Sequence, residues 1–421
     1  MKKSDPIRWL LWLLFIGMGV LTGCGTTGKV SLQNLVYLYQ PDKQFATLNN
    51  CVYHTSDSTS TLFVEVLFND LVYLKDPFTG LYACNYRLSY NLKEGYEKKE
   101  VLQSSLVMSG DSLNYGKSAK KVHSFELKTF YPEKYLLEIT LYDLNRNGGT
   151  TVYREVDKSS RQTRQNYLLL DINNELMWKD QRVEGEPFRI VSNRNDLNFL
   201  IVNRYVRDFP VARPPYTEEN EPSFDYKPDS LYLQPVFNGQ TDWIRLAGPG
   251  FYHFRQDTIS RDGVTVFLYP EGFPEITTAG QLRYPLRYIT TRKEYDTLTE
   301  SENVKAAVDD FWLKTARTPD RAQLLFKKYY SNVEDANRWF TSYQEGWKTD
   351  RGLIYIIFGK PGYVYRGEGF EEWIYGEPQN RNSLTFTFVK VINPFTDNDY
   401  MLLRSPTLKE PWFVTVQSWR R

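Results

Sequence analysis

The spacing of apolar residues changes once along this 421-residue chain, near Tyr295. Before that point, short runs rich in β-branched and aromatic residues alternate with polar turns, which is typical of β-strands. After it, apolar residues recur every three or four positions, as they do on one face of a helix. The pattern therefore predicts a mainly β fold followed by an α+β part, and the length is sufficient for two to four domains.

The β pattern divides into two parts, at about residues 24–160 and 161–292. The strand-like segments of the first part are residues 61–68, 82–91, 124–128, 135–142 and 150–153. Those of the second part are residues 167–171, 199–203, 229–233 and 264–269. Short strands at this spacing predict two β-sandwich-like domains.

Residues 293–421 are predicted to form an α+β domain, a helical pair packed on a small antiparallel sheet. Thr299 and Glu302 have capping-box spacing, and Pro319 stands in the first position of a second helix. We expect that helix to end at Gly346 in a left-handed cap. The strands predicted after it are residues 353–358, 372–375, 384–389 and 401–403.

Residues 346–352 read Gly-Trp-Lys-Thr-Asp-Arg-Gly, and residues 353–362 continue as Leu-Ile-Tyr-Ile-Ile-Phe-Gly-Lys-Pro-Gly. This run resembles the signature of the GWxTD-domain family of bacterial proteins, and the resemblance covers about residues 295–421. The two β parts also suit the longer lipoprotein members found in Bacteroidota, although there the match is one of architecture. The resemblance supplies no catalytic residues, because the family is defined by sequence alone.

The motif has two interpretations, which the sequence leaves open. As a structural corner, Trp347 would fold back over the preceding helix, and Asp350 and Arg351 would pair with each other or cap the turn. As a binding site, Trp347, Asp350 and Arg351 would line a surface for a ligand or partner. The candidate residues are Gly346, Trp347, Thr349, Asp350, Arg351 and Gly352.

The N-terminus has the form of an export signal. A basic start precedes an uncharged apolar run at residues 9–21, which is shorter than the roughly 20 residues that span a bilayer. The run ends in Leu-Thr-Gly-Cys, which resembles the bacterial lipobox and implies a leader at residues 1–23 and acyl chains, such as palmitate, on Cys24. By resemblance to lipoprotein sorting, Gly25 and the lack of an acidic cluster after it favour an outer-membrane lipoprotein that faces the periplasm.

Lipid on Cys24 leaves Cys51 and Cys84 as the other cysteines of the chain. In an oxidising compartment they form either a disulfide across the first domain or two small buried hydrophobic side chains. The sequence does not decide between these two.

The sequence contains little material for catalysis or metal binding. It has three histidines, a net charge of +1, no run of basic residues and none of the hydrolase, metalloprotease, P-loop or dinucleotide motifs. We interpret His54, His123 and His253 as satisfied or surface histidines, and the calcium-like segment 143–148 as a hairpin turn. We therefore expect no cofactor, no metal site, no nucleic-acid partner and no enzymatic activity.

Together these features predict a non-enzymatic outer-membrane lipoprotein. It would serve as a structural or interaction subunit of an outer-membrane protein assembly, such as secretion, motility or barrel-insertion machinery, with outer-membrane proteins as partners. In that arrangement the two β domains form a spacer between the lipid and the C-terminal domain. The alternative is a cell-envelope lipoprotein that binds or hydrolyses glycans.

Overall fold

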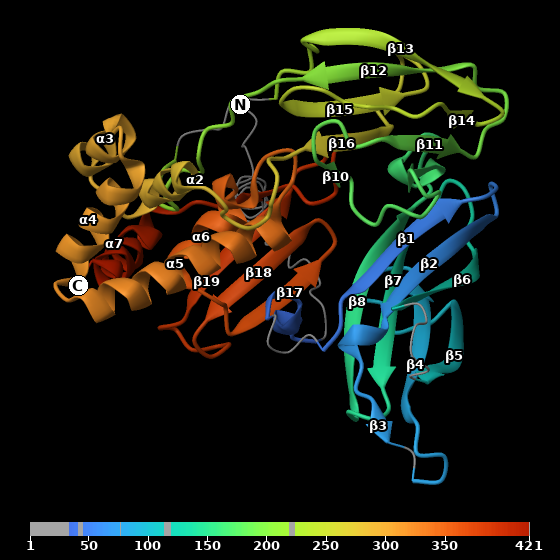
Figure 1. The fold of residues 1–421 in the computed structure, drawn as a ribbon, viewed down its shortest axis with the longest axis horizontal. Helices are drawn as coiled ribbons and strands as arrows, with labels where there is room; N and C mark the ends of the chain where they lie inside the picture. The colour runs from blue at the N-terminus through green and yellow to red at the C-terminus, as the bar shows by residue number, and fades with distance from the viewer. Residues whose placement is uncertain (1–32, 41–44, 76, 113–118, 219–223, 421) are drawn as a thin grey trace, which may run out of the picture.

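The computed structural model describes residues 33–40, 45–75, 77–112, 119–218 and 224–420. These residues form two β units and a C-terminal α+β unit (Figure 1). The predicted leader at residues 1–23 and the predicted lipid attachment at Cys24 lie outside the described residues. The predicted fold class, β-sandwich-like domains followed by an α+β domain, is confirmed.

The first β unit is a sandwich of two antiparallel sheets. One sheet has the order β1-β2-β6, and in the other β3-β4-β7-β8 are joined by β5, which pairs with β4. Alternate residues of β1 are buried, so one face of each strand points into the shared core. The strands are β1 (Leu48–His54), β2 (Thr59–Leu67), β3 (Leu74–Lys75), β4 (Tyr82–Lys93), β5 (Gln103–Ser112), β6 (Lys120–Lys128), β7 (Lys134–Asp143) and β8 (Gly148–Asp157).

The second β unit is one curled sheet with the order β10-β16-β15-β12-β13-β14-β11-β9. Its neighbours are antiparallel except for β10 and β16, and its inner faces enclose a separate apolar core. The strands are β9 (Tyr167–Asp171), β10 (Gln181–Arg182), β11 (Phe188–Ser192), β12 (Phe199–Tyr205), β13 (Ser230–Phe237), β14 (Gln240–Thr241), β15 (Gly250–Arg255) and β16 (Val264–Leu268).

The α+β unit packs helices against a four-stranded antiparallel sheet of order β17-β18-β19-β20 (Figure 1). The strands are β17 (Tyr363–Gly367), β18 (Phe370–Tyr375), β19 (Leu384–Lys390) and β20 (Tyr400–Leu402). The helices are α2 (Ala279–Arg283), α3 (Arg292–Glu300), α4 (Val304–Ala316), α5 (Pro319–Phe340), α6 (Asp350–Phe358) and α7 (Lys409–Trp419). Helix α5 begins at Pro319 as predicted, whereas the predicted boundary at residue 293 falls inside α3.

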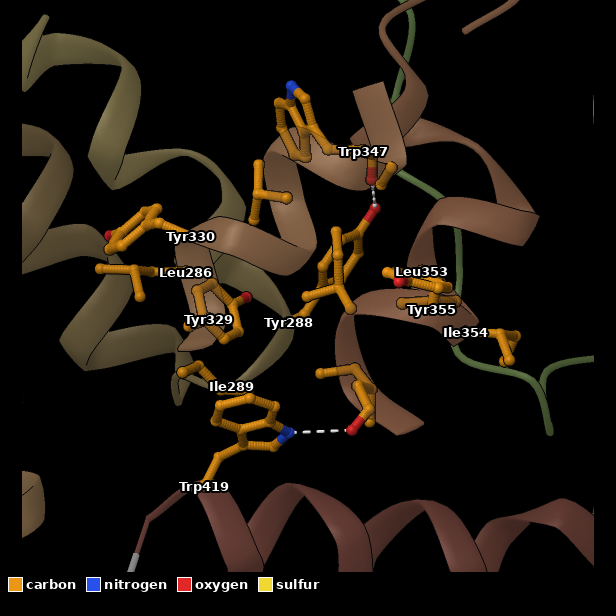
Figure 2. Packing of buried hydrophobic residues seen from close by; sticks show 14 of the residues in the cluster. Leu286, Tyr288, Ile289, Tyr329, Tyr330, Trp347, Leu353, Ile354, Tyr355 and Trp419 are labelled. Carbon is orange, nitrogen blue, oxygen red and sulfur yellow. Dashed lines mark hydrogen bonds between the residues drawn. The ribbon is translucent and has the colours of Figure 1, made fainter. Parts of the chain in front are cut away.

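Aromatic side chains join these helices into one core. The Tyr288 hydroxyl donates to the Trp347 carbonyl at 2.8 Å, and the Trp419 indole donates to the Ile357 carbonyl at 2.9 Å (Figure 2). Between them the Tyr329 ring is fully buried and lies 5.3 Å from the Trp419 ring, centre to centre. Buried Tyr and Trp side chains supply a large apolar area while their polar atoms find partners, so they account for much of the aromatic content of this unit.

Three local predictions in the α+β unit are wrong. Residues 353–358 belong to helix α6 and not to a strand. Residues 353–357 are all buried, and the six consecutive apolar residues show neither the spacing of a strand nor that of a helix. Helix α5 ends at Phe340, before the predicted cap. The start predicted at Thr299 is the end of α3, and the next helix is capped by Asn303, whose side chain accepts from the Ala306 amide at 3.1 Å.

An aromatic cluster joins the second β unit to the α+β unit. Phe395, from the loop between β19 and β20, lies 4.9 Å from the Phe251 ring and 5.2 Å from the Tyr205 ring, centre to centre. This cluster covers one end of the outer face of the second sheet.

Among the described helices, none combines the length and the apolar character needed to cross a membrane.

Two buried histidines, one in each β unit, have the same pattern of hydrogen bonds. His54 is paired across its hairpin with Ser60, and His253 with Thr265. In each case the hydroxyl lies 2.8 Å from Nδ1, while Nε2 lies within 2.9 Å of a backbone carbonyl oxygen. Each ring is therefore neutral, with the proton on Nε2, and burial lowers the pKa of both imidazoles to about 4.

These histidines predict a loss of stability in acid. Between pH 6.5, the pKa in the unfolded chain, and pH 4, the pKa in the folded chain, the unfolded chain binds protons that the folded chain does not. Stability therefore decreases as the pH is lowered through this range. Lowering the pH from 7 to 5 should cost about 2 kcal/mol per histidine. In H54N and H253N, urea unfolding at the two pH values should show a smaller difference than in the wild type. An unchanged difference would contradict the assignment.

Candidate interaction motif

The motif at residues 346–352 forms the connection between α5 and α6. Gly346–Lys348 makes one 3-10 turn, η6, and Thr349 then caps α6. The Thr349 hydroxyl accepts from the Gly352 amide at 3.1 Å and donates to the Gly346 carbonyl at 2.8 Å. Threonine suits this position because its side chain satisfies an amide that has no partner inside the helix.

Both glycines of the motif are required by close backbone contacts. A Cβ on Gly346 would lie 1.9 Å from the Ala336 carbonyl oxygen, and one on Gly352 would lie 1.9 Å from the Gly346 carbonyl oxygen. Neither glycine has a positive φ, so the left-handed cap predicted for Gly346 is wrong. The absence of a side chain, and not an unusual backbone angle, is what this corner needs.

Trp347 packs beside Tyr288 with 6.2 Å between ring centres (Figure 2). Its side chain is buried, and its backbone amide donates to the Asn337 side-chain oxygen at 3.1 Å. The indole therefore closes the corner between α5 and η5 (Pro285–Tyr288).

Asp350 ties the start of α6 to the edge strand β20. One carboxylate oxygen accepts from the Leu402 amide at 2.7 Å, and the other forms an ion pair with Arg404 at 2.5 Å. Both side chains of the pair are more than nine-tenths buried. The carboxylate thus acts inside the fold, where charge-assisted hydrogen bonds are strong.

Arg351 lies between two aromatic rings. Its guanidinium carbon is 4.0 Å from the centre of the Tyr400 ring and 5.2 Å from that of Phe340. One terminal nitrogen donates to the Asn398 carbonyl at 2.9 Å, and the other lies 3.6 Å from the Glu371 carboxylate. Neighbouring residues on a helix point in different directions, so Asp350 and Arg351 reach different partners: Asp350 binds Arg404, whereas Arg351 binds Asn398 and lies near Glu371.

Glu371 is the fully buried centre of the network that Arg351 enters. It accepts from Arg366 at 2.8 Å, from the Trp373 indole at 2.6 Å and from the Tyr39 hydroxyl at 2.7 Å. Burial raises the pKa of this carboxyl, but the charges of Arg366 and Arg351 and these hydrogen bonds outweigh burial and leave the pKa below its ordinary value. The carboxylate is therefore ionised in the folded protein.

Sequence reasoning missed Glu371, Arg366 and Tyr39 as members of this site. One signal was present. Successive side chains of β18 point to opposite faces of the sheet, so Glu371 lies on the same face as the buried Trp373. An acidic residue on the apolar face of a strand needs buried donors. No local pattern showed that one donor is Tyr39, 332 residues away.

The described geometry supports the structural-corner interpretation of the motif. Trp347, Asp350 and Arg351 are 6%, 5% and 2% exposed, and each is engaged by other side chains or backbone groups. They are not available to line a binding surface. Any partner contact of this unit must use other residues.

The cysteines do not form the disulfide considered above. Cys51 and Cys84 are both free. Cys51 lies on the outer face of β1, whereas Cys84 points into the sandwich core from β4, so strand alternation directs the two thiols apart. Burial raises the pKa of both thiols, which favours the unreactive form.

The calcium-like segment is a β-hairpin turn between β7 and β8. The Asp143 carboxylate accepts from the backbone amides of Val72, Asn145 and Arg146. Within the described residues, no three His, Cys, Asp or Glu side chains gather in a way that could hold a metal ion.

The glycine contacts predict a strong effect of single methyl groups. G346A or G352A should lower the free energy of unfolding by about 3 kcal/mol or more, because a Cβ at 1.9 Å forces α5, η6 and α6 apart. G280A is the control, since its Cβ would meet nothing closer than 3.9 Å. Urea unfolding followed by tryptophan fluorescence measures all three variants. Near-wild-type stability of G352A would contradict the close-contact explanation.

The Glu371 network predicts that neutralising Glu371 destabilises the protein far more than neutralising its neighbour Glu372. E371Q removes the buried carboxylate that faces the guanidinium groups of Arg351 and Arg366 and should cost about 3–5 kcal/mol of unfolding free energy. E372Q, at the adjacent half-buried position of β18, should change it by less than about 1 kcal/mol. Equal effects of the two substitutions in urea unfolding would show that the buried charge is not what matters.

Comparison with known proteins gives one family match. The family model described as the GWxTD domain matches residues 250–421, so the match begins at β15 and includes the last two strands of the second β unit. No curated protein matches the chain. Among solved structures, that of red sea bream transglutaminase is similar over 53% of this chain, with 10% identity and a TM-score of 0.19. The aligned part spans 31% of that enzyme, and a TM-score this low supports no inference about activity. The chain therefore carries a GWxTD domain at residues 250–421.

Proposed function

We propose that this protein is a lipid-anchored, non-enzymatic interaction subunit of an outer-membrane protein assembly. Secretion, motility and barrel-insertion machinery are the classes of assembly that suit a lipoprotein of this compartment. Acyl chains on Cys24 would hold the protein at the periplasmic face of the outer membrane and raise its effective concentration near membrane partners. The polar side chains Asp350 and Arg351 of the motif are used inside the fold, so the proposed interaction would use other residues.

One exposed apolar strip carries the proposal of an interaction role. In β13, alternate residues lie on the same face of the sheet, and Phe199 of β12 is paired with Pro235 on that face. Leu231, Leu233 and Phe237 are 56%, 55% and 65% exposed. We call these residues the β13 strip: Phe199, Leu231, Leu233, Pro235 and Phe237.

The β13 strip is an uncovered continuation of an internal interface. On the same face, Tyr205 of β12 is buried beneath Phe395 of the GWxTD domain. Strand β13, the neighbour of β12 at the top of the view in Figure 1, continues this face, and its side chains Leu231, Leu233 and Phe237 are exposed. Contiguous exposed apolar residues of this kind mark protein-interaction surfaces in folded proteins.

Glycan handling, the alternative function, has less support. Trp243 is exposed and would offer a stacking surface for a sugar, but the Arg189 guanidinium lies 4.8 Å from the centre of its ring and occupies one face. The protein-interaction proposal is therefore preferred.

The proposal predicts that charges on the β13 strip abolish partner capture. The double variant L231D/L233D, expressed as the tagged lipoprotein in its host, should lose at least tenfold of a membrane-protein partner recovered after cross-linking and purification. L106D/M108D is the matched control, because these two residues are also two apart on a strand and are 55% and 58% exposed. Its partner yield should equal that of the wild type.

Two results would overturn the proposal. In the first, the wild type recovers no stoichiometric membrane protein and binds glycans instead. In the second, the β13 and β5 variants lose the partner equally, which would remove the strip as the interaction surface.

A further inference from the structure

The first described residues dock by their backbone on the edge of the GWxTD domain, and the Tyr37 side chain reaches across to Tyr153 of the first β sandwich. Residues 34–39, which we call the N-terminal strap, follow the free edge of β17 and include the 3-10 turn η1 (Val36–Tyr39). Leu35 and Tyr39 are 1% and 3% exposed and belong to the core of that domain. Figure 1 shows this blue segment beside β17, far in sequence from the orange strands that it contacts.

Backbone and side-chain hydrogen bonds hold the start of the strap. The Leu35 amide donates to the Val364 carbonyl at 2.8 Å, and the Val364 amide donates to the Asn34 side-chain oxygen at 2.9 Å. The Asn34 side-chain nitrogen donates to the Gly362 carbonyl at 3.3 Å. The strap thus satisfies the backbone groups of an edge strand, which makes it a docked element of the domain.

The strap has a defined direction along the domain. It starts beside Gly362 and ends at Tyr39, whose hydroxyl accepts from Arg366 at 2.6 Å and donates to Glu371. The β17–β18 hairpin lies at the Tyr39 end, and there Lys390 forms an ion pair with Glu155 of the first sandwich at 2.7 Å. The first sandwich therefore meets the GWxTD domain at the end opposite to the one where the strap begins.

We infer that the GWxTD domain is the membrane-proximal part of the lipoprotein and that its Gly362 end faces the bilayer. This inference rests on the proposed lipid anchor at Cys24. Asn34 follows Cys24 by ten positions, so the docked start of the strap lies at most about 36 Å from the acylated residue. The two β units then project away from the membrane, the reverse of the spacer arrangement expected from chain order.

The surface at the Gly362 end suits contact with lipid headgroups. It consists of the turn at residues 359–362 and the loop at residues 376–383, which connects β18 to β19. Its exposed side chains are polar: Lys360, Glu377, Gln379, Asn380, Arg381 and Asn382. Such a surface can lie against headgroups without entering the hydrocarbon layer.

Quenching by labelled lipids tests this orientation. The full-length lipidated protein is reconstituted in phosphatidylethanolamine–phosphatidylglycerol vesicles that contain a lipid with a nitroxide on its headgroup. A fluorescent unnatural amino acid replaces either Arg381 or Phe78, which is 95% exposed on the first sandwich. We expect the probe at residue 381 to be quenched at least threefold more than the probe at residue 78.

A linker variant supplies the control without altering the folded part. Twenty Gly and Ser residues inserted after residue 30 lengthen the connection to the lipid while the strap stays intact. Quenching at residue 381 should fall toward the value at residue 78. Stronger quenching at residue 78 than at residue 381 in the wild type would overturn the orientation and leave the anchor standing.

Failure of the anchor itself gives a different result. In that case the wild type and C24A would both stay in the aqueous phase on vesicle flotation, and mass spectrometry would find no acyl groups. That outcome rejects the proposed function and this inference together.

Discussion

A single buried carboxylate, that of Glu371, organises the GWxTD domain. Moving an ion of this size out of water costs several kcal/mol, and the cost is offset only when donors surround it. Here the donors come from separate segments: Tyr39 from the strap, Arg366 from β17 and Trp373 from β18, with Arg351 of α6 nearby. Because these segments all donate to the same carboxylate, none can move away without leaving the buried charge short of a donor.

A second buried ion pair, Asp350 with Arg404, joins helix α6 to the edge strand β20. Asp350 binds the backbone of β20 and the side chain of Arg404, while its neighbour Arg351 lies near Glu371 of β18, so adjacent residues of one helix contact two strands of the sheet. The glycines of the motif let α5 and η6 come close enough for both residues to reach their partners. The motif is therefore best understood as the point where helices and sheet are joined.

Much of the fold could be predicted from the sequence because its signals are local. Strand alternation located most of the β-strands, and Pro319 with three-and-four spacing located α5. Helix α6 could not be predicted in this way, because residues 353–357 are all buried and their β-branched content favours a strand. The signals for a helix were the cap residue Thr349 and Asp350 in the first turn. These two residues were outweighed in the prediction by the longer apolar run that follows them.

In the candidate site, the residues of the motif could be predicted from the sequence, but their partners could not. The motif residues could be named from their spacing, but Arg404, Asn398 and Glu371 could not be assigned as their partners, since these contacts are 20 to 54 residues away in sequence. Tyr39 lies farther still, beyond two complete domains. Its contact with Glu371 has a mechanical consequence: a pull on the strap acts on the same carboxylate that Arg351 approaches from α6. If the proposed lipid holds the chain ahead of the strap, force from the membrane therefore enters the molecule at the core of the GWxTD domain.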